Sequence, residues 1–236
     1  MSLPVGDGWA LGVSYAYVGA VAAAAELLRR FRGCSREAAR KIVHVGVGLF
    51  VIPTVFLFSD WRIAVIPPLS FAVVNFVIHR FRLLPALDAE PLNFGTVFFP
   101  LSFAALLALF FRPGSHEDLS AVAVAGVLSM ALGDAAAAEF GRRYGTRRYT
   151  ILGHSRTMEG SLAMFLVSGA AIAVTLVALG GFGAHAAVAF GLVVGTAAAG
   201  LEAVSPFGSD NLTVPLGSAG ILTILLQISE SALGIN

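Results

Sequence analysis

The sequence predicts an all-α protein embedded in a membrane, a polytopic integral membrane bundle of about eight transmembrane helices, with seven as the alternative count. Composition gives the first reason for this fold class. Of the 236 residues, 57% are hydrophobic and only 12% are charged, against roughly 45–50% and 25% in soluble domains. The second reason is that the apolar residues gather in stretches close to the about 20 residues with which a helix crosses a bilayer.

Eight spans result when helix breakers and charges are taken as the boundaries of the apolar stretches. Pro67 and Pro68 fall in the third span, where a membrane helix accommodates proline as a kink, and Pro215 makes the last span the weakest. We expect one transmembrane domain over residues 1–236, and a retained first helix, because no Lys or Arg precedes the first hydrophobic stretch. The expected spans are residues 9–28, 42–59, 62–79, 94–111, 119–140, 160–180, 184–203 and 211–229.

The basic residues give a test of the spans that is independent of hydropathy. Three connections, after the first, third and fifth spans, hold thirteen of the 15 Lys and Arg residues. Only Arg62 and Arg112 lie on the other side. The positive-inside rule therefore predicts that these three connections are cytoplasmic and that both termini lie outside.

Several classes of protein are excluded or disfavoured. The net charge of +1 favours neither a nucleic-acid partner nor an acidic one, and Cys34, the one cysteine, rules out an internal disulfide framework. The sequence has no Walker GxxxxGK[ST] motif and no kinase glycine loop, so a soluble nucleotide-binding fold does not supply the chemistry. Gly191 and Gly195 form a GxxxG motif, which we interpret as close helix packing. The oligomeric state stays open, a homo-oligomer included.

Lys41 and His44 share one helix face at the start of the second span. A positive-inside anchor with an incidental histidine is one interpretation. A functional site is the other, because an imidazole inside an apolar segment needs a partner.

Two acids interrupt the fifth span in the stretch SMALGDAAAAEFGRRYG, residues 129–145. An ionisable group such as Asp134 marks either a functional site or a salt bridge, here to Arg142 or Arg143. Glu139 lies five residues on, about 140° further round the helix, so it does not readily share an ion with Asp134. We therefore expect Asp134 to be a metal ligand and Glu139 to face the interface.

Residues 141–161, GRRYGTRRYTILGHSRTMEGS, place five arginines beside flexible glycine turns. Guanidinium groups pair bidentately with phosphate, so the cluster suits a polyphosphate, with anionic lipid headgroups as the alternative. Thr157 resembles a helix cap, in which case Glu159 is a favourable charge in the first turn of that helix.

Residues 201–215, LEAVSPFGSDNLTVP, bring Glu202, Asp210 and Asn211 together through a turn. Their oxygens are ligands that magnesium prefers, especially when substrate phosphates complete the shell, although ordinary turn chemistry explains the Asp and Asn equally. A basic patch, several acids and a histidine at one membrane face together indicate metal-assisted transfer from a nucleotide to a membrane-embedded acceptor.

Five blocks of the sequence resemble, in order, the signature blocks of the polyprenol kinase family, which includes dolichol, phytol, farnesol and CTP-dependent diacylglycerol kinases and is distantly related to phosphatidate cytidylyltransferases. One departure is that Arg156 and Thr157 stand where family members commonly have Lys-Ser. The blocks are RKIVHVGVG (40–48), NFGTVFFPLSF (93–103), GDAAAAEFGRRYG (133–145), RTMEGSLAMF (156–165) and LEAVSPFGSDNLTVPL (201–216).

The resemblance implies a multi-pass kinase that uses Mg²⁺ or another divalent cation to move the γ-phosphate of CTP onto a lipid alcohol, either an isoprenoid (phytol, farnesol, geranylgeraniol or a dolichol-like alcohol) or diacylglycerol. One alternative is a cytidylyltransferase that acts on a lipid phosphate. A transporter or lipid-binding protein is a minor alternative, because the polar groups collect on one side. Together the motifs predict catalytic roles for Lys41, His44, Asp134 and Glu159, nucleotide or phosphate binding by Arg142, Arg143, Arg147, Arg148, Arg156, Thr157, Gly160 and Asn211, and metal binding by Asp134, Asp210 and Glu202.

Overall fold

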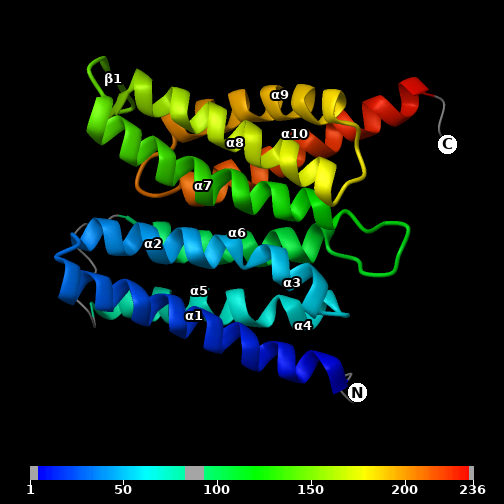
Figure 1. Ribbon diagram of the computed structural model, residues 1–236, viewed down its shortest axis with the longest axis horizontal. Helices are drawn as coiled ribbons and strands as arrows, with labels where there is room; N and C mark the ends of the chain where they lie inside the picture. The colour runs from blue at the N-terminus through cyan, green and yellow to red at the C-terminus, as the bar shows by residue number, and fades with distance from the viewer. Residues whose placement is uncertain (1–4, 83–92, 234–236) are drawn as a thin grey trace.

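The computed structural model describes residues 5–82 and 93–233 and confirms a polytopic helical bundle (Figure 1). Among these residues, seven helical segments are long and apolar enough to cross a membrane, and the remaining expected span is a shorter apolar helix of 16 residues, α6. The elements are α1 (Val5–Arg32), α2 (Arg36–Leu49), α3 (Val51–Leu57), α4 (Trp61–Ala64), α5 (Ile66–Phe81), α6 (Gly95–Phe110), α7 (Ser120–Tyr144), β1 (Arg148–Ile151), β2 (His154–Thr157), α8 (Met158–Ala178), α9 (Ala184–Val204) and α10 (Asp210–Leu233).

The expected spans correspond in order to α1, α2 with α3, α4 with α5, and then α6 to α10 singly. The second span begins at Arg36 rather than at residue 42, because Ser35 caps α2. Pro67 and Pro68 do not kink a continuous helix. They lie in the first turn of α5 after a break at Val65, where a missing backbone N–H costs nothing.

Two groups of helices lie side by side in Figure 1. The first comprises α1 to α6 and the second α7 to α10. The first turn of α1 and the last turns of α10 lie at the same end of the bundle, opposite the end that carries β1. An even number of passes accounts for this arrangement, so α6 counts as a pass of the chain despite its length.

Small residues let α7, α8 and α9 approach one another closely. A Cβ atom added to Gly191 would lie 2.4 Å from the carbonyl oxygen of Gly169, and one added to Gly195 would lie 2.9 Å from the Cα atom of Gly169. The GxxxG motif therefore packs α9 against α8 within the chain, as interpreted from the sequence. Gly133 of α7 faces Ser168 of α8 in the same way, since an added Cβ would lie 2.2 Å from the Ser168 hydroxyl.

The sequence did not lead us to expect the antiparallel hairpin that joins α7 to α8. In this hairpin β1 pairs with β2. Leu152 and Gly153 form its turn with φ angles of 49° and 81°, and two successive positive φ angles are typical of two-residue hairpin turns. We expected turns at the glycines of this connection. A positive φ at a leucine could not be expected, because the sequence signal for that conformation is a glycine.

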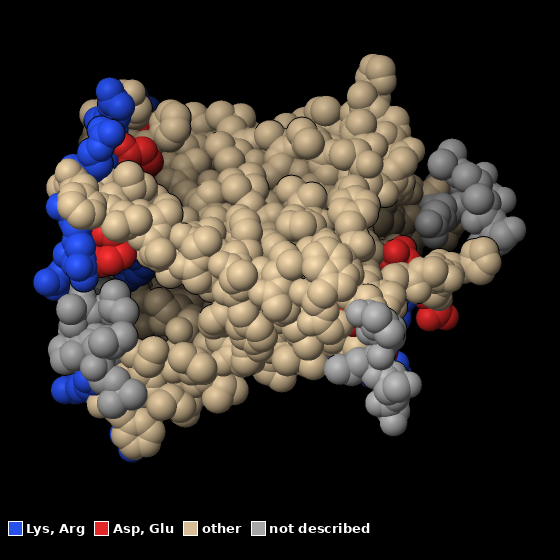
Figure 2. All heavy atoms as spheres, turned by 60° about the horizontal axis from the view of Figure 1, so that its bottom comes forward, with Lys and Arg blue, Asp and Glu red and all other residues tan. Residues whose placement is uncertain are grey.

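Basic side chains gather at one end of the molecule, where α1 ends, α2 begins and the hairpin lies (Figure 2). We call it the basic end. The arrangement agrees with the grouping of the three basic connections expected from the sequence. The residues concerned are Arg29, Arg30, Arg32, Arg36, Arg40, Lys41, Arg80, Arg82, Arg142, Arg143, Arg147, Arg148 and Arg156.

At the opposite end, a buried acid fastens α1 to the connection between α3 and α4. Asp7 is 1% exposed. Its Oδ1 accepts hydrogen bonds from the backbone N and the hydroxyl of Ser59, at 3.0 and 2.9 Å, and its Oδ2 accepts one from Asp60 N at 3.2 Å. Because its partners among the described residues are neutral donors of one short segment, we assign Asp7 a structural role.

Candidate active site

A cavity of about 1440 Å³ opens at the basic end and extends between the helices, and Figure 2 shows the surface hollowed beside the basic side chains. Its lining residues are of two kinds, by which we distinguish a polar part and an apolar arm. The polar part is lined by residues that include Lys41, His44, Asp134, Arg156, Glu202, Asp210 and Asn211, and the apolar arm by residues that include Val18, Ala22, Val47, Phe50, Phe71, Phe99 and Phe103.

Lys41 and Asp134 form an ion pair that joins α2 to α7. His44, one turn further along α2, places Nε2 4.0 Å from the same carboxylate oxygen, Oδ2, and its ring lies against Phe99 with the centroids 4.0 Å apart. Nε2 is buried and has no hydrogen-bond partner among the described residues, which is costly unless a ligand supplies one. Asp134 thus pairs with Lys41, whereas Arg142, one of the two arginines named as its alternative salt-bridge partners, pairs with Glu139 at 2.6 Å.

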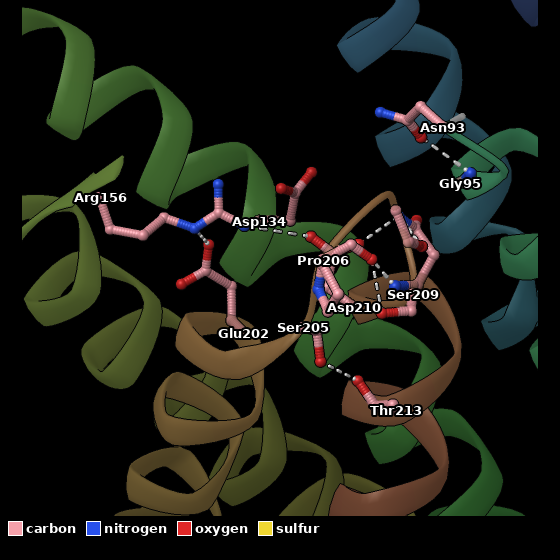
Figure 3. A network of polar contacts seen from close by, with 12 residues as sticks. Asn93, Gly95, Asp134, Arg156, Glu202, Ser205, Pro206, Ser209, Asp210 and Thr213 are labelled. Carbon is pink, nitrogen blue, oxygen red and sulfur yellow. Dashed lines mark hydrogen bonds and ion pairs between the residues drawn. The ribbon is translucent and has the colours of Figure 1, made fainter. Parts of the chain in front are cut away.

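Arg156 joins the hairpin to two buried carboxylates (Figure 3). Its Nε lies 2.7 Å from Glu202 Oε1 and its Nη2 lies 3.8 Å from Asp210 Oδ2. The side chains of Glu202 and Asp210 are only 7% and 12% exposed, so each needs a nearby cation. One planar guanidinium serves both, which a single ammonium group would do less well.

A glycine turn brings the start of α10 against the start of α6. Gly208 has a φ of +80°, and a Cβ atom there would lie 2.3 Å from Asn93 Oδ1, so the position requires glycine. Asn93 Oδ1 in turn accepts a hydrogen bond from Gly95 N at 3.0 Å. On the other side of the turn, the side chain and the backbone N of Asn211 both donate to Asp210 Oδ1 at 2.9 Å, which orients that carboxylate.

A second glycine contact directs Arg156 into the cavity. A Cβ atom added to Gly160 would lie 2.9 Å from the Ala137 carbonyl oxygen, and one added to Gly141 would lie 2.8 Å from Thr157 Oγ1. The end of α7 therefore touches the start of α8. Thr157 caps α8, as expected, with its Oγ1 accepting a hydrogen bond from Gly160 N at 3.1 Å, and the preceding residue of β2, Arg156, points toward α9 and α10 (Figure 3).

Comparison with known proteins gives one decisive relative. The chain is 39% identical over 221 residues to the phytol kinase of Synechocystis sp., an alignment that covers 93% of this chain and 91% of that protein. The chain belongs to the polyprenol kinase family. No family model matches the sequence, and no solved structure matches it.

Several residues that we expected in the active site lie outside the cavity. Glu159 accepts hydrogen bonds from Thr146 Oγ1 at 2.6 Å and from Arg147 N at 3.3 Å, so it ties the base of the hairpin to α8. Glu159 does not line the cavity. The four arginines between the last turn of α7 and the start of β1 do not line it either: Arg142, Arg143, Arg147 and Arg148.

Other arginines line the cavity at its basic end and were assigned no phosphate-binding role from the sequence. They are Arg29 of α1 and Arg36 and Arg40 of α2. Arg29 is held by Glu26, with 2.7 Å from its Nε to Oε2. Arg36 and Arg40 are four residues apart, a spacing that shares a helix face, and this signal was present in the sequence.

The carboxylates of this polyprenol kinase family member fit a divalent cation only in company with phosphate. In the described part of the chain, no group of three or more His, Cys, Asp or Glu side chains is placed to hold a metal by itself. Mg²⁺ commonly takes one or two carboxylates and completes its shell with substrate phosphates and water. Asp134, Asp210 and Glu202 all line the same polar part, so their donor chemistry is compatible with that mode.

Proposed function

We propose that this chain is a CTP-dependent kinase that transfers the γ-phosphate of CTP to the hydroxyl of an isoprenoid alcohol of the phytol class, assisted by Mg²⁺. The acceptor class is supported by the 39% identity to a curated phytol kinase. CTP as donor is supported by the resemblance of the five sequence blocks to the polyprenol kinase family.

The observation that carries the proposal is the two-part cavity. Its volume of about 1440 Å³ exceeds the about 300–1,000 Å³ of a typical single-ligand pocket. Charged groups line one part and apolar side chains the other, and the two parts are continuous. This division supports a triphosphate in the polar part and a lipid tail in the apolar arm, with the lipid hydroxyl beside the charged groups where the parts join.

His44 and Asp134 lie at that junction and are the candidates to orient the hydroxyl. In the transfer, the hydroxyl oxygen forms a bond to the γ-phosphorus, the bond from that phosphorus to the β–γ bridging oxygen breaks, and CDP leaves. The hydroxyl proton passes to Nε2 of His44, in the tautomer that carries its own proton on Nδ1. The buried Nε2 without a partner suits that role, since a general base must lie within hydrogen-bond reach of the proton it accepts.

Lys41 and Arg156 are two cations of the polar part of the cavity. Each neutralises carboxylates in the absence of ligand, and each can turn to phosphate oxygens, which guanidinium and ammonium groups bind strongly. Arg36 and Arg40 then attract the nucleotide at the mouth of the cavity. Asp134, Asp210 and Glu202 would hold the divalent cation, which supplies charge neutralisation at the transferring phosphoryl group.

We propose in addition that the basic end faces the cytoplasm. Thirteen of the 15 Lys and Arg residues lie there, and cytoplasmic connections carry such an excess.

Labelled CTP tests the proposed reaction with purified protein, phytol and Mg²⁺. We expect label from the γ-phosphate in the lipid product, and none from the α-phosphate. Transfer of α-label with release of pyrophosphate would instead establish a cytidylyltransferase. Replacing CTP by ATP, and phytol by farnesol, dolichol or diacylglycerol, ranks donors and acceptors in the same assay.

A further inference from the structure

Four helices each turn one face toward the apolar arm. On α1 the lining side chains recur at spacings of three or four, which places them on a single stripe, and the same holds for α2, α5 and α6. The stripe on α1 is made of serine, valine and alanine, whereas the other helices contribute valines, aromatic residues and prolines. The lining residues concerned are Ser14, Val18, Ala22 and Ala25 of α1, Val43 and Val47 of α2 with Phe50 just after it, Pro67, Pro68 and Phe71 of α5, and Phe99, Pro100 and Phe103 of α6.

Contacts between α1 and α2 fix the depth of the arm relative to His44. Tyr17 of α1 donates a hydrogen bond to the Gly46 carbonyl oxygen at 3.0 Å, and a Cβ atom on Gly46 would lie 2.6 Å from Val21. Ala22 is therefore level with His44. From Ala22 to Ser14 the stripe continues for eight residues, or about 12 Å along the helix.

A depth of that order accommodates the first isoprene units of a prenyl tail. The wall at the level of His44 is formed on the α1 side by a single methyl group, that of Ala22, which is exposed toward the cavity. Any larger side chain at this position would occupy the space directly beyond the reacting hydroxyl.

We propose that the apolar arm binds the isoprenoid tail of the acceptor, and that Ala22 is a specificity-determining residue, because its small side chain leaves room for the tail beyond the first prenyl unit. This proposal rests on the proposed function. It goes further in assigning the tail to one side of the molecule, between α1, α2, α5 and α6, and in naming a residue that sets acceptor length.

The test compares Ala22→Trp with Ala24→Trp in the full-length protein. Ala24 is also exposed but lies two residues on, on the other side of α1, and does not line the cavity. We expect Ala22→Trp to lower kcat/KM for phytol about tenfold or more, with kcat/KM for a five-carbon prenol changed less than about twofold. The control should leave both values within about twofold. Equal losses on both acceptors, or no loss, would overturn the assignment.

A labelling experiment decides the matter if Ala22→Trp proves unstable. Ala22→Cys and Ala24→Cys are made in a Cys34→Ser background, and maleimide labelling is followed with and without phytol. Protection of position 22 alone supports the proposal, and equal labelling with and without phytol contradicts it. Because labelling needs no turnover, protection without any transfer from CTP would show that the proposed reaction had failed while the tail site held.

Discussion

The two groups of helices solve different problems. In α7, α8 and α9, glycines at the contacts let backbones touch, as at Gly191 and Gly169, and the middle of α7 from Val122 to Ala131 is buried throughout. In α1, α2, α5 and α6, the facing side chains line the apolar arm of the cavity of about 1440 Å³. The close-packed group supplies fixed carboxylates and the open group supplies space. Polar contact between the groups across the cavity includes the Lys41–Asp134 ion pair.

The largest expected effect is at that ion pair. Asp134→Asn keeps the shape of the side chain but removes its charge, so we expect kcat to fall about 10²–10³-fold while the fold is retained. Transfer of γ-label from CTP to phytol measures the loss. Glu139→Gln is the matched control, because Glu139 lies on the same helix, is exposed and pairs only with Arg142 in the described structure. Full activity in Asp134→Asn would disprove its role in the site.

Substitution of Arg156 tests whether the stability of the close-packed group depends on the positive charge that the hairpin supplies. Arg156→Ala leaves Glu202 and Asp210 buried without their cation, and we expect a loss of about 3–5 kcal/mol in unfolding free energy. Denaturant unfolding in detergent measures this loss. Arg156→Lys should recover part of it, since one ammonium group replaces a bridging guanidinium.

Arg148→Ala is the control for that experiment. Arg148 is on the paired strand of the same hairpin but is exposed and does not line the cavity. An equal loss in Arg148→Ala would mean that the hairpin, rather than the buried carboxylates, accounts for the effect.

Gly191→Ala tests the close packing directly. The new Cβ would lie 2.4 Å from a backbone oxygen of α8, so α9 must shift, at a cost of about 1–3 kcal/mol. The midpoint of thermal unfolding measures it. Gly200→Ala makes the same change on the same helix where nothing lies within 4 Å, and it should leave the midpoint unchanged or raise it. If both variants behave alike, the contrast between the two groups of helices is wrong.

The smallest effects distinguish the arginines that line the cavity from those that do not. We expect Arg40→Ala to raise the KM for CTP about tenfold, as loss of one hydrogen bond to a charged group does. Arg148→Ala should change that KM by less than about twofold, because an exposed cation acts only through a screened field. Initial rates at fixed phytol and varied CTP provide the comparison, and similar changes in both variants would return the phosphate-binding role to the hairpin.

Most of the fold could be predicted from the sequence, because membrane-spanning helices are identified by the length and hydropathy of their apolar stretches. The positions of Pro67 and Pro68 show the limit: hydropathy locates a span but does not distinguish a kink from a helix start. The hairpin of β1 and β2 was not predicted, for another reason. Its turn places Leu152 at a positive φ, a conformation that leucine rarely adopts.

Part of the lining of the cavity was predictable from the sequence, but its geometry was not. Lys41 and Asp134 are 93 positions apart, and helix periodicity gives no information on which faces of distant helices meet. Glu159 illustrates the consequence, since its motif placed it among the charged groups, whereas its hydrogen bonds hold the hairpin. Arg36 and Arg40 are the opposite case: they line the cavity but were given no role in it. The positive-inside rule already explained their charge, so there was no further reason in the sequence to assign them to the site.

The attachment of α1 has a mechanical consequence. Asp7, Tyr15 and Tyr17 hydrogen-bond to other elements. Beyond them on α1, Glu26 pairs with Arg29 and Arg30 of the same helix. In the described part of the chain, the helix is thus fixed by hydrogen bonds over its N-terminal half and makes none to other elements over its C-terminal half. A small tilt of that C-terminal half would widen the mouth of the cavity without breaking any of the fixing bonds.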